Sequence, residues 1–375
     1  MDGPCRPCHR GTMDAIDRPI SLRCGLDFPH RIALAPLTNT QSAPDGTLGD
    51  DELEWLRRRA TGGFRVISTC AAFVSDEGHA WSGQLGIASD RHIPGLSRLA
   101  ADLHAHGSVA VVQLHHAGAK ADLCPGRPLS AVDGGPANAR AATTADIDRV
   151  VGDFVAAARR AEQAGFAGVE IHGANGYLFT QFLTPSDNTR TDGYGGDLAG
   201  RARFLREATR AVRAGVSSGF AVGVRLSPVD LWDRRGLVLD DSLVVARWLV
   251  DDGADLIHLS LRDAAGPPPH EPDRGPVARA FRDALPADVP VLAAGGIWTR
   301  DDARRAVDAG VDVVVLGRAA IAHPDWPTVS MAPDWRPVRP PWDPDYLAGV
   351  AVGPNLLRYL RGIPGLVTDG AEPRR

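Results

Sequence analysis

Three residues that could form a reaction centre, His172, Asn175 and Tyr177, lie within six positions of one another in the run HGANGY. The segment that leads into this run, from Val169, alternates apolar and polar residues, which predicts a strand. Two glycines then interrupt the alternation, so the three polar side chains can face one point beyond the strand end. Two nitrogen donors and a phenol around one space suit a reaction in which an oxygen becomes negative while a proton is delivered nearby. A polar loop that only closes a turn is the alternative, because short motifs also match by chance.

Overall composition is that of a large globular domain. The chain has 375 residues, of which 44% are hydrophobic and 23% charged, so it can bury one large core or two ordinary ones. A net charge of −5 without any Lys/Arg block predicts binding to neither nucleic acid nor a membrane surface. No apolar run reaches the roughly 18 residues that a spanning helix needs, and the first residues resemble no export signal. We therefore expect a cytoplasmic protein.

The five cysteines are too scattered to predict a disulfide framework, so reduced thiols are expected. Cys5, Cys8 and His9 have the spacing of a haem attachment site, but no export signal accompanies them. A lone pair of cysteines also lacks the second pair of ligands that a structural zinc ion needs. We expect no metal site, and the first 20 residues are interpreted as a flexible extension.

Strand-like and helix-like segments alternate along the chain, which favours parallel β/α units. The helical segments span residues 50–61, 95–107, 143–165, 198–216, 239–253, 276–285 and 299–310, and a last helix is expected near 355–361. The expected strands begin at Arg31, Phe64, Val109, Gly168, Ala221, Leu256, Val289 and Val311. Eight units in about 300 residues predict a (β/α)8 TIM barrel, whose active site is built at the C-terminal ends of the strands.

This barrel is expected to be one domain, residues 21–330. The Gly/Pro-rich stretch 117–142, after the third strand, is too long for a plain connection and is predicted to form part of a lid over the barrel mouth. Residues 331–375 form a Pro/Trp-rich C-terminal tail, predicted to pack on the barrel or on a neighbouring subunit. The oligomeric state is left open, a homo-oligomer included.

Glycine-rich turns follow the last two strands, where barrels commonly bind phosphate through backbone N–H groups. Gly295 and Gly296 follow the seventh strand, and Gly317 and Arg318 follow the eighth. Simple chain reversal is the alternative for each pair of glycines. Because such turns occur in both of the expected loops, they predict a phosphate site more strongly than one turn alone would.

Two polar residues interrupt otherwise apolar strands. Gln113 is either a hydrogen-bonded core group or a partner for a planar heterocycle. Arg225 either pairs with Glu170 on the adjacent strand or contacts a cofactor, because a buried guanidinium is costly without an anion or a ring beside it. A phosphate site, an amide and a fixed positive charge together describe a phosphorylated heteroaromatic cofactor, and FMN fits best.

The motifs resemble those of the old yellow enzyme family from residue 21 to about 324. They are APLT on the first strand, VQL on the third, HGANGY with the following QFL and YGG on the fourth, VRLSP on the fifth, AGGI on the seventh and LGRA on the eighth. The resemblance implies an FMN-dependent oxidoreductase that takes hydride from NADPH or NADH and reduces the activated C=C bond of a small α,β-unsaturated carbonyl compound.

The resemblance also implies a role for each matching residue. His172 and Asn175 grip the carbonyl oxygen of the substrate, and Tyr177 protonates its α-carbon. The residues implied to bind FMN are Ala35, Pro36, Leu37, Thr38, Ala71, Gln113, His172, Arg225, Gly295, Gly296, Gly317 and Arg318. Thr38 is implied to contact the O4/N5 edge, Gln113 the pyrimidine edge, Arg225 the N1/O2 region, and the glycines with Arg318 the phosphate.

The chain departs from the family pattern at a few positions. Thr38 stands where one branch has a cysteine, His115 occupies a pocket position that is a large aromatic in some relatives, and Ala119 replaces an arginine. These changes bear on subclass and substrate preference. A biosynthetic oxidase, dehydrogenase or isomerase with the same flavin site is an alternative. A phosphate-binding lyase barrel is a remote one, since its Schiff-base lysine could only be Lys120, which is not on a strand.

Overall fold

The computed structural model describes residues 14–134, 137–231 and 235–368. Eight parallel strands close into a barrel in the order β10-β11-β12-β3-β4-β5-β8-β9. Their bounds are β3 (Ile32–Leu34), β4 (Val66–Phe73), β5 (Val109–His115), β8 (Gly168–Gly173), β9 (Ala221–Leu226), β10 (Leu256–Ser260), β11 (Val291–Ala294) and β12 (Val313–Leu316). The predicted (β/α)8 barrel is confirmed.

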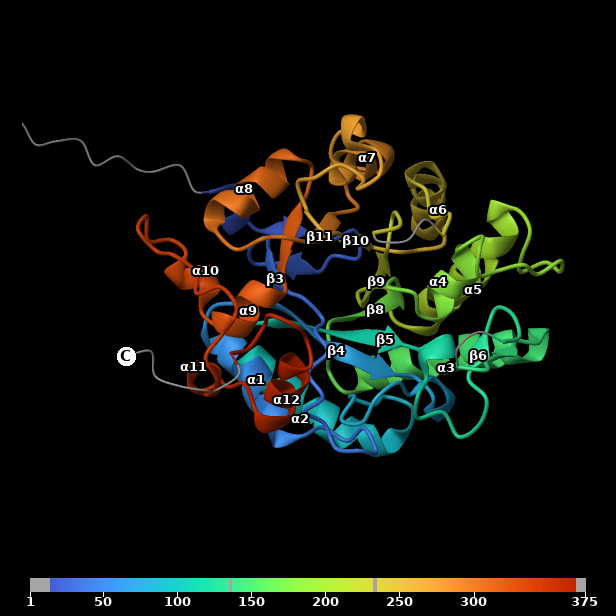
Figure 1. The fold of residues 1–375 in the computed structure, drawn as a ribbon, viewed down its shortest axis with the longest axis horizontal. Helices are drawn as coiled ribbons and strands as arrows, with labels where there is room; N and C mark the ends of the chain where they lie inside the picture. Colours follow the sequence, from blue (N-terminus) through green and yellow to red (C-terminus); the bar gives the residue numbers. More distant parts are fainter. Residues whose placement is uncertain (1–13, 135–136, 232–234, 369–375) are drawn as a thin grey trace, which may run out of the picture.

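Helices lie outside this ring and connect successive strands (Figure 1). They are α1 (Asp50–Thr61), α2 (Ile93–Ala105), α3 (Thr144–Gln163), α5 (Leu198–Gly215), α6 (Leu239–Asp251), α7 (Val277–Ala284) and α8 (Arg300–Asp308). The N-caps Thr143 and Thr299 each form a capping box with an aspartate three residues on. Because the helices cover the outer face, most strand residues are buried on both faces and read as apolar runs.

A small hairpin covers the N-terminal ends of the strands. It consists of β1 (Ile20–Ser21) and β2 (Asp27–Phe28), and Leu22 and Phe28 pack against Val66 and Leu256 at the beginnings of β4 and β10. Apolar packing therefore fills this end of the barrel. Space for a ligand is left at the opposite end, where the strands have their C-terminal ends.

The N-terminal segment packs on the barrel before residue 21. A single turn, η1 (Ala15–Asp17), buries Ile16 completely, and Asp14 lies 3.2 Å from Arg300 of α8. The packed unit thus begins several residues earlier than the boundary expected at residue 21. Cys5, Cys8 and His9 lie outside the described residues.

The described parts of the stretch 117–142, residues 117–134 and 137–142, fold at one side of the barrel mouth. They contain η4 (Gly118–Lys120) and a two-stranded sheet of β6 (Leu129–Ser130) and β7 (Arg140–Ala141), and both η4 and β6 contact the short helix α4 (Leu178–Leu183). Short turns η2 (Asp76–Gly78), η3 (Asp90–His92) and η5 (Pro272–Arg274) occur in other loops. The segment predicted to be a lid thus packs against α4 at the edge of the barrel mouth, and its η4 lies at the mouth itself.

The C-terminal tail, as far as residue 368, lies against the barrel. It follows α9 (Arg318–Ala322) and α10 (Trp326–Val329) and contains α11 (Pro344–Gly349) and α12 (Pro354–Arg361) beside α1 (Figure 1). Trp342 and Leu347 are fully buried, and Gly353 N donates to Gln41 Oε1 at 3.0 Å. These contacts join the tail to the loop after β3. A contact with a neighbouring subunit stays a prediction.

Within the described residues, none of the helices combines the length and the apolar character needed to cross a membrane. The cytoplasmic location expected from the sequence stays a prediction.

Candidate functional site

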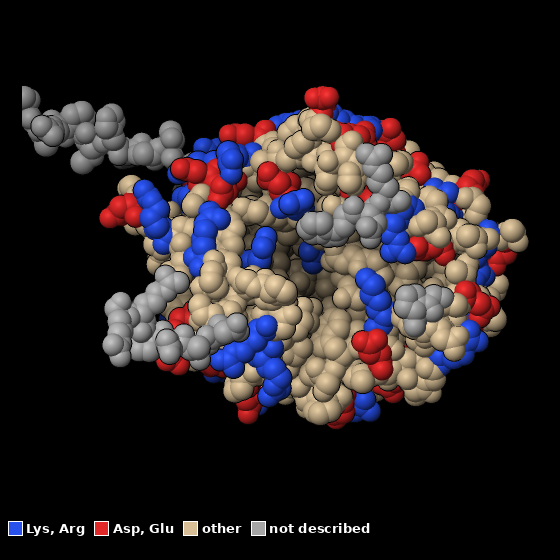
Figure 2. Space-filling view, viewed as in Figure 1, with Lys and Arg blue, Asp and Glu red and all other residues tan. Residues whose placement is uncertain are grey.

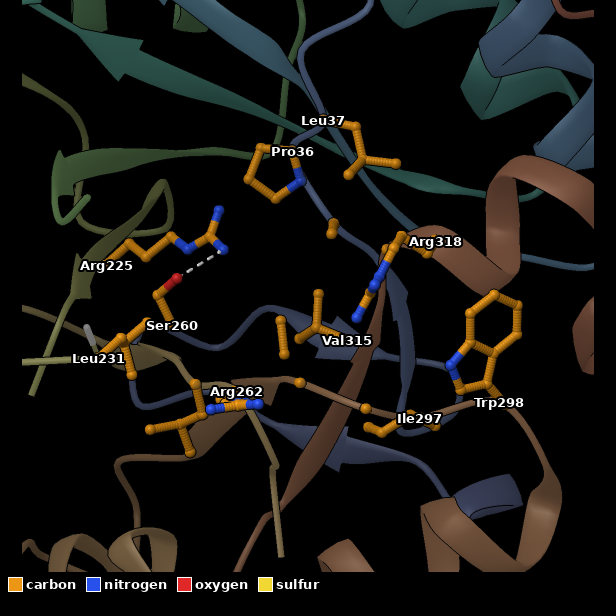
Figure 3. Close-up of a pocket in the computed structure, with 16 residues that line it drawn as sticks. Pro36, Leu37, Arg225, Leu231, Ser260, Arg262, Ile297, Trp298, Val315 and Arg318 are labelled. Atoms are coloured by element: carbon orange, nitrogen blue, oxygen red, sulfur yellow. Dashed lines mark hydrogen bonds between the residues drawn. The ribbon is translucent and has the colours of Figure 1, made fainter. Parts of the chain in front are cut away.

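A cavity of about 510 Å³ opens at the C-terminal ends of the strands, a size typical of cofactor pockets. Its lining comes from the ends of β3, β9, β10, β11 and β12 and the loops that follow them (Figure 3). Eight residues predicted to bind a cofactor line it: Ala35, Pro36, Leu37, Arg225, Gly295, Gly296, Gly317 and Arg318. Figure 2 shows a hollow at the centre of this face, with several Lys and Arg side chains at its rim.

One end of the cavity suits an anion. Gly296 has a φ of +67°, and a Cβ on Gly295 would come within 2.6 Å of the carbonyl oxygen of Leu261, so neither position tolerates an ordinary side chain. Arg318 and Arg262 both line the same cavity (Figure 3). Exposed backbone beside two guanidinium groups is an arrangement that binds phosphate.

A directed series of hydrogen bonds joins Arg225, Ser260 and Asn175. Arg225 Nη2 donates to Ser260 Oγ at 3.2 Å (Figure 3), and Ser260 Oγ lies 3.1 Å from Asn175 Oδ1. A guanidinium can only donate and an amide oxygen can only accept, so the Ser260 hydroxyl accepts from Arg225 and donates its own proton to Asn175 Oδ1. The amide of Asn175 is thereby oriented with its Nδ2 donors away from Ser260, toward any oxygen bound on the other side.

The backbone at Asn175 is held in an uncommon conformation. Its φ is +61° and that of Gly176 is +72°, both in the left-handed region. Asn175 N donates to Ser227 Oγ at 2.9 Å, and Lys120 Nζ donates to Asn175 O at 2.9 Å. This turn ends the alternation of the strand after His172, and the side chain of Asn175 lies against Ser260.

His172 and Tyr177 lie together, as the sequence predicts. Their ring centroids are 5.1 Å apart, and the ring of His115 lies 5.4 Å from His172 and 4.4 Å from Tyr177. His172 Nδ1 is buried without a hydrogen-bond partner among the described residues, and so is Arg225 Nε. Buried polar atoms are normally paired, so both atoms indicate a bound group at this place.

The environment sets the protonation states of these residues. Burial, followed by electrostatic interactions with His115 and Arg225, holds the pKa of His172 well below its ordinary value, so this ring is neutral. Burial, followed by the proximity of Tyr359 in α12, raises the pKa of Tyr177 above its ordinary value of about 10. The phenol therefore keeps its proton at neutral pH and can act as an acid.

A buried polar layer lies beneath these residues. Gln113 Nε2 donates to Glu170 Oε1 at 2.7 Å, and His258 Nδ1 lies 2.7 Å from Glu170 Oε2. Burial alone would raise the pKa of Glu170, but His258, Arg225 and Gln113 outweigh it and lower that pKa. Glu170 is thus an anion that counters the charge of Arg225 without a direct contact. The ion pair between Arg225 and Glu170, one of the two expected alternatives, is not formed; Arg225 donates to Ser260 instead.

The remaining predicted residues do not belong to the lining of this cavity. Thr38 follows Leu37 and is half-buried, while Ala71 pairs with Gln113 across β4 and β5. Asn175 borders a second recess of about 370 Å³, which shares Leu231 with the first. The two predicted groups, one for the cofactor and one for the reaction, are therefore neighbours.

Several residues of the site were not predicted. Arg262 lies two residues after the end of β10, just beyond the strand-end positions from which the sequence predicts the site. Gln84 bonds to His115, and Lys120 bonds to Asn175, across loops that carry no periodic signal.

Comparison with known proteins places this geometry among flavoenzymes. The model of the NADH:flavin oxidoreductase / NADH oxidase family matches residues 16–330. The probable NADH-dependent flavin oxidoreductase YqiG of Bacillus subtilis is 36% identical over 322 residues, which cover 82% of this chain and 85% of that protein.

Two further relatives extend the comparison. The NADH:fumarate oxidoreductase of Klebsiella pneumoniae is 34% identical over 84% of this chain, which spans only 35% of that protein's length. The solved structure of an old yellow enzyme homologue from Zymomonas mobilis superposes with a TM-score of 0.74 at 28% identity, covering 84% of this chain and 91% of the homologue.

Proposed function

The chain belongs to the NADH:flavin oxidoreductase / NADH oxidase family, that of the old yellow enzymes, and from this we propose that it reduces the activated C=C bond of small α,β-unsaturated carbonyl compounds, with Tyr177 as the proton donor. As a member it is a flavin oxidoreductase that uses FMN and a nicotinamide donor, NADH or NADPH. The finer assignment of substrate and of residue roles is ours.

The observation that carries the proposal is the set of three donors at the C-terminal end of β8. The amide Nδ2 of Asn175, the neutral ring of His172 and the protonated phenol of Tyr177 come from one turn, and the first is aligned by Ser260. This set fits an acceptor whose oxygen gains negative charge next to a carbon that gains a proton.

The cavity residues fit FMN. Its phosphate would be held by Gly295, Gly296, Gly317 and Arg318, with Arg262 as an addition that the sequence did not suggest, and its ring by Arg225 and the run from Ala35 to Leu37. We propose that Thr38, Ala71, Gln113 and His172, which are outside this lining, contact the ring as well. The unpaired buried nitrogens of Arg225 and His172 support a heteroaromatic ring there. When bound, FMN supplies the two electrons and the hydrogen of a hydride, taken from NAD(P)H, to the β-carbon of the alkene.

The protein residues then act on the other end of the conjugated system. Hydride addition at the β-carbon pushes an electron pair toward the carbonyl oxygen, where His172 and Asn175 donate hydrogen bonds. Fixed donors at such an oxygen lower the barrier by roughly 3–4 kcal/mol each in other enzymes. Tyr177 delivers its proton to the α-carbon, which completes the saturated product, and water returns the proton to the phenolate.

Stopped-flow kinetics on the yellow, FMN-loaded protein test the proposal. The flavin is reduced by NADPH or NADH, and its reoxidation is followed with enones, maleimides and nitroalkenes, with dissolved oxygen as the reference oxidant. We expect at least one enone to reoxidise the flavin faster than oxygen does. If none does, and substrate oxidation consumes oxygen instead, the alternative of an oxidase or dehydrogenase with the same flavin site takes its place.

A further inference from the structure

Gln84, in the loop between η2 and η3, has its amide orientation determined by the backbone. The side chain is fully buried; its Oε1 accepts from Ala80 N at 2.9 Å, and its Nε2 donates to Ala71 O at 2.9 Å. A backbone N–H only donates and a carbonyl only accepts, so the amide cannot be flipped. The second Nε2 hydrogen is left for His115 Nδ1, at 3.0 Å.

This contact selects one form of His115. Because Gln84 Nε2 can only donate, His115 Nδ1 must accept, and the imidazole proton resides on Nε2. Burial, with smaller contributions from His116 and Lys120, lowers the pKa of His115 to about 3, so the ring stays neutral at working pH. A second proton on Nδ1 would face the amide hydrogens of Gln84.

The ring that Gln84 holds is a direct neighbour of Tyr177. The two rings meet edge to face, with centroids 4.4 Å apart and planes at 82°. Lys120 Nζ lies 5.0 Å from the centroid of the Tyr177 ring, and His172 completes the surroundings. Tyr177 itself is the N-cap of α4, and these three side chains contact its ring.

We propose that Gln84 and His115 are positioning residues for Tyr177: Gln84 holds His115 in one rotamer and one tautomer, and the His115 ring holds the phenol where it delivers its proton. The proposal rests on the assignment of Tyr177 as the proton donor. It explains why an amide is buried behind a histidine that touches the reaction centre. It also gives a role to His115, whose Nε2 is buried without a partner among the described residues.

The tautomer is tested directly by ¹H–¹⁵N spectroscopy of the FMN-loaded protein with labelled histidine. The His115 signal is identified by its absence in His115→Phe. We expect Nε2 protonated and Nδ1 bare in the wild type. Gln84→Glu, which replaces the donor by an acceptor of the same size, should move the proton to Nδ1. A proton on Nδ1 in the wild type would overturn the proposal.

Kinetics test the positioning. Gln84→Met keeps the side-chain volume but removes the amide with its donors and its acceptor. Gln41→Met is the matched control, since Gln41 is also a buried amide and, among the described residues, its side chain bonds to Gly353 of the tail. We expect reoxidation by a weakly activated enone to fall about 10- to 100-fold in Gln84→Met, the usual effect of a misplaced reacting group. Flavin reduction and FMN content should match the Gln41→Met control. Equal enone rates in the two variants would contradict the proposal.

A double-mutant cycle separates positioning from general destabilisation. In a Tyr177→Phe background, Gln84→Met should change the enone rate less than about twofold, because the group that it positions is gone. If the rate losses of the two single variants add in the double variant, the positioning role of Gln84 is wrong, while the role of Tyr177 as proton donor is unaffected. Full enone turnover in the single Tyr177→Phe variant would instead remove the proton donor of the proposed function.

Discussion

Ser260→Ala is the sharpest test of how the site orients its donors. The substitution removes one hydroxyl, which accepts from Arg225 Nη2 at 3.2 Å and donates to Asn175 Oδ1 at 3.1 Å. Without that donor, the Asn175 amide can present either its oxygen or its nitrogen to the substrate. The fold and the cavity stay as they are, since the side chain lost is small.

The size of the effect follows from the bonds that are lost. A neutral hydrogen bond contributes about 0.5–1.5 kcal/mol, which corresponds to a rate loss of about 2- to 12-fold if Asn175 acts in the transition state. The upper bound is the loss on removing the amide itself, expected at about 10²–10³-fold for Asn175→Ala by analogy with other oxyanion donors. Ser260→Ala should therefore lie well below Asn175→Ala.

The assay is single-turnover reoxidation of the reduced enzyme by an enone, with oxygen as the reference oxidant. Ser227→Ala is the matched control, because Ser227 Oγ accepts from the backbone N–H of Asn175 and does not contact the side-chain amide of that residue. We expect the enone rate of Ser260→Ala to fall while its oxygen rate is retained. An unchanged enone rate, or a larger loss in Ser227→Ala, would refute the orienting role of Ser260.

Three further predictions concern other parts of the site. Tyr177→Phe should reduce turnover of weakly activated enones by about 10²–10⁴-fold, as for other general acids, while flavin reduction by the nicotinamide stays nearly normal in stopped-flow traces. Arg225→Met should weaken FMN binding about 10- to 150-fold, from the loss of a charged hydrogen bond, and make the flavin harder to reduce in a potentiometric titration. Enone reoxidation should be constant from about pH 6 to 9, because the pKa of His172 is lowered and that of Tyr177 is raised. The rate should decline only above about pH 10, as Tyr177 loses its proton.

Each of these predictions has a contrary result. Full enone turnover in Tyr177→Phe would assign the proton to another group or to solvent. An unchanged reduction potential in Arg225→Met would separate this residue from the flavin. A decline near pH 6.5 would mean that an ordinary histidine titrates in the mechanism, against the burial of His172 and His115.

The barrel could be predicted because its signals are local. Apolar strands and amphipathic helices repeat with short connections, and helices such as α1 and α5 begin at the expected residues. The short helix α4 was missed, because all six of its residues are buried and it therefore shows no amphipathic period. The start of the packed unit was also set too late, because one buried residue, Ile16, carries no periodic signal.

By itself, the sequence determined which residue types stand at the strand ends: glycines and Arg318 after the last two strands, Arg225 on the fifth, and the His–Asn–Tyr turn after the fourth. Only the tertiary structure decided how their hydrogen bonds are directed. Ser260 and Asn175 are 85 positions apart, and Gln84 and His115 are 31 apart. Such pairs meet only when the barrel closes, and no local pattern records the distance between side chains so far apart along the chain. The orientation of a side-chain amide and the tautomer of a histidine depend on such contacts, so they are determined only in the folded protein.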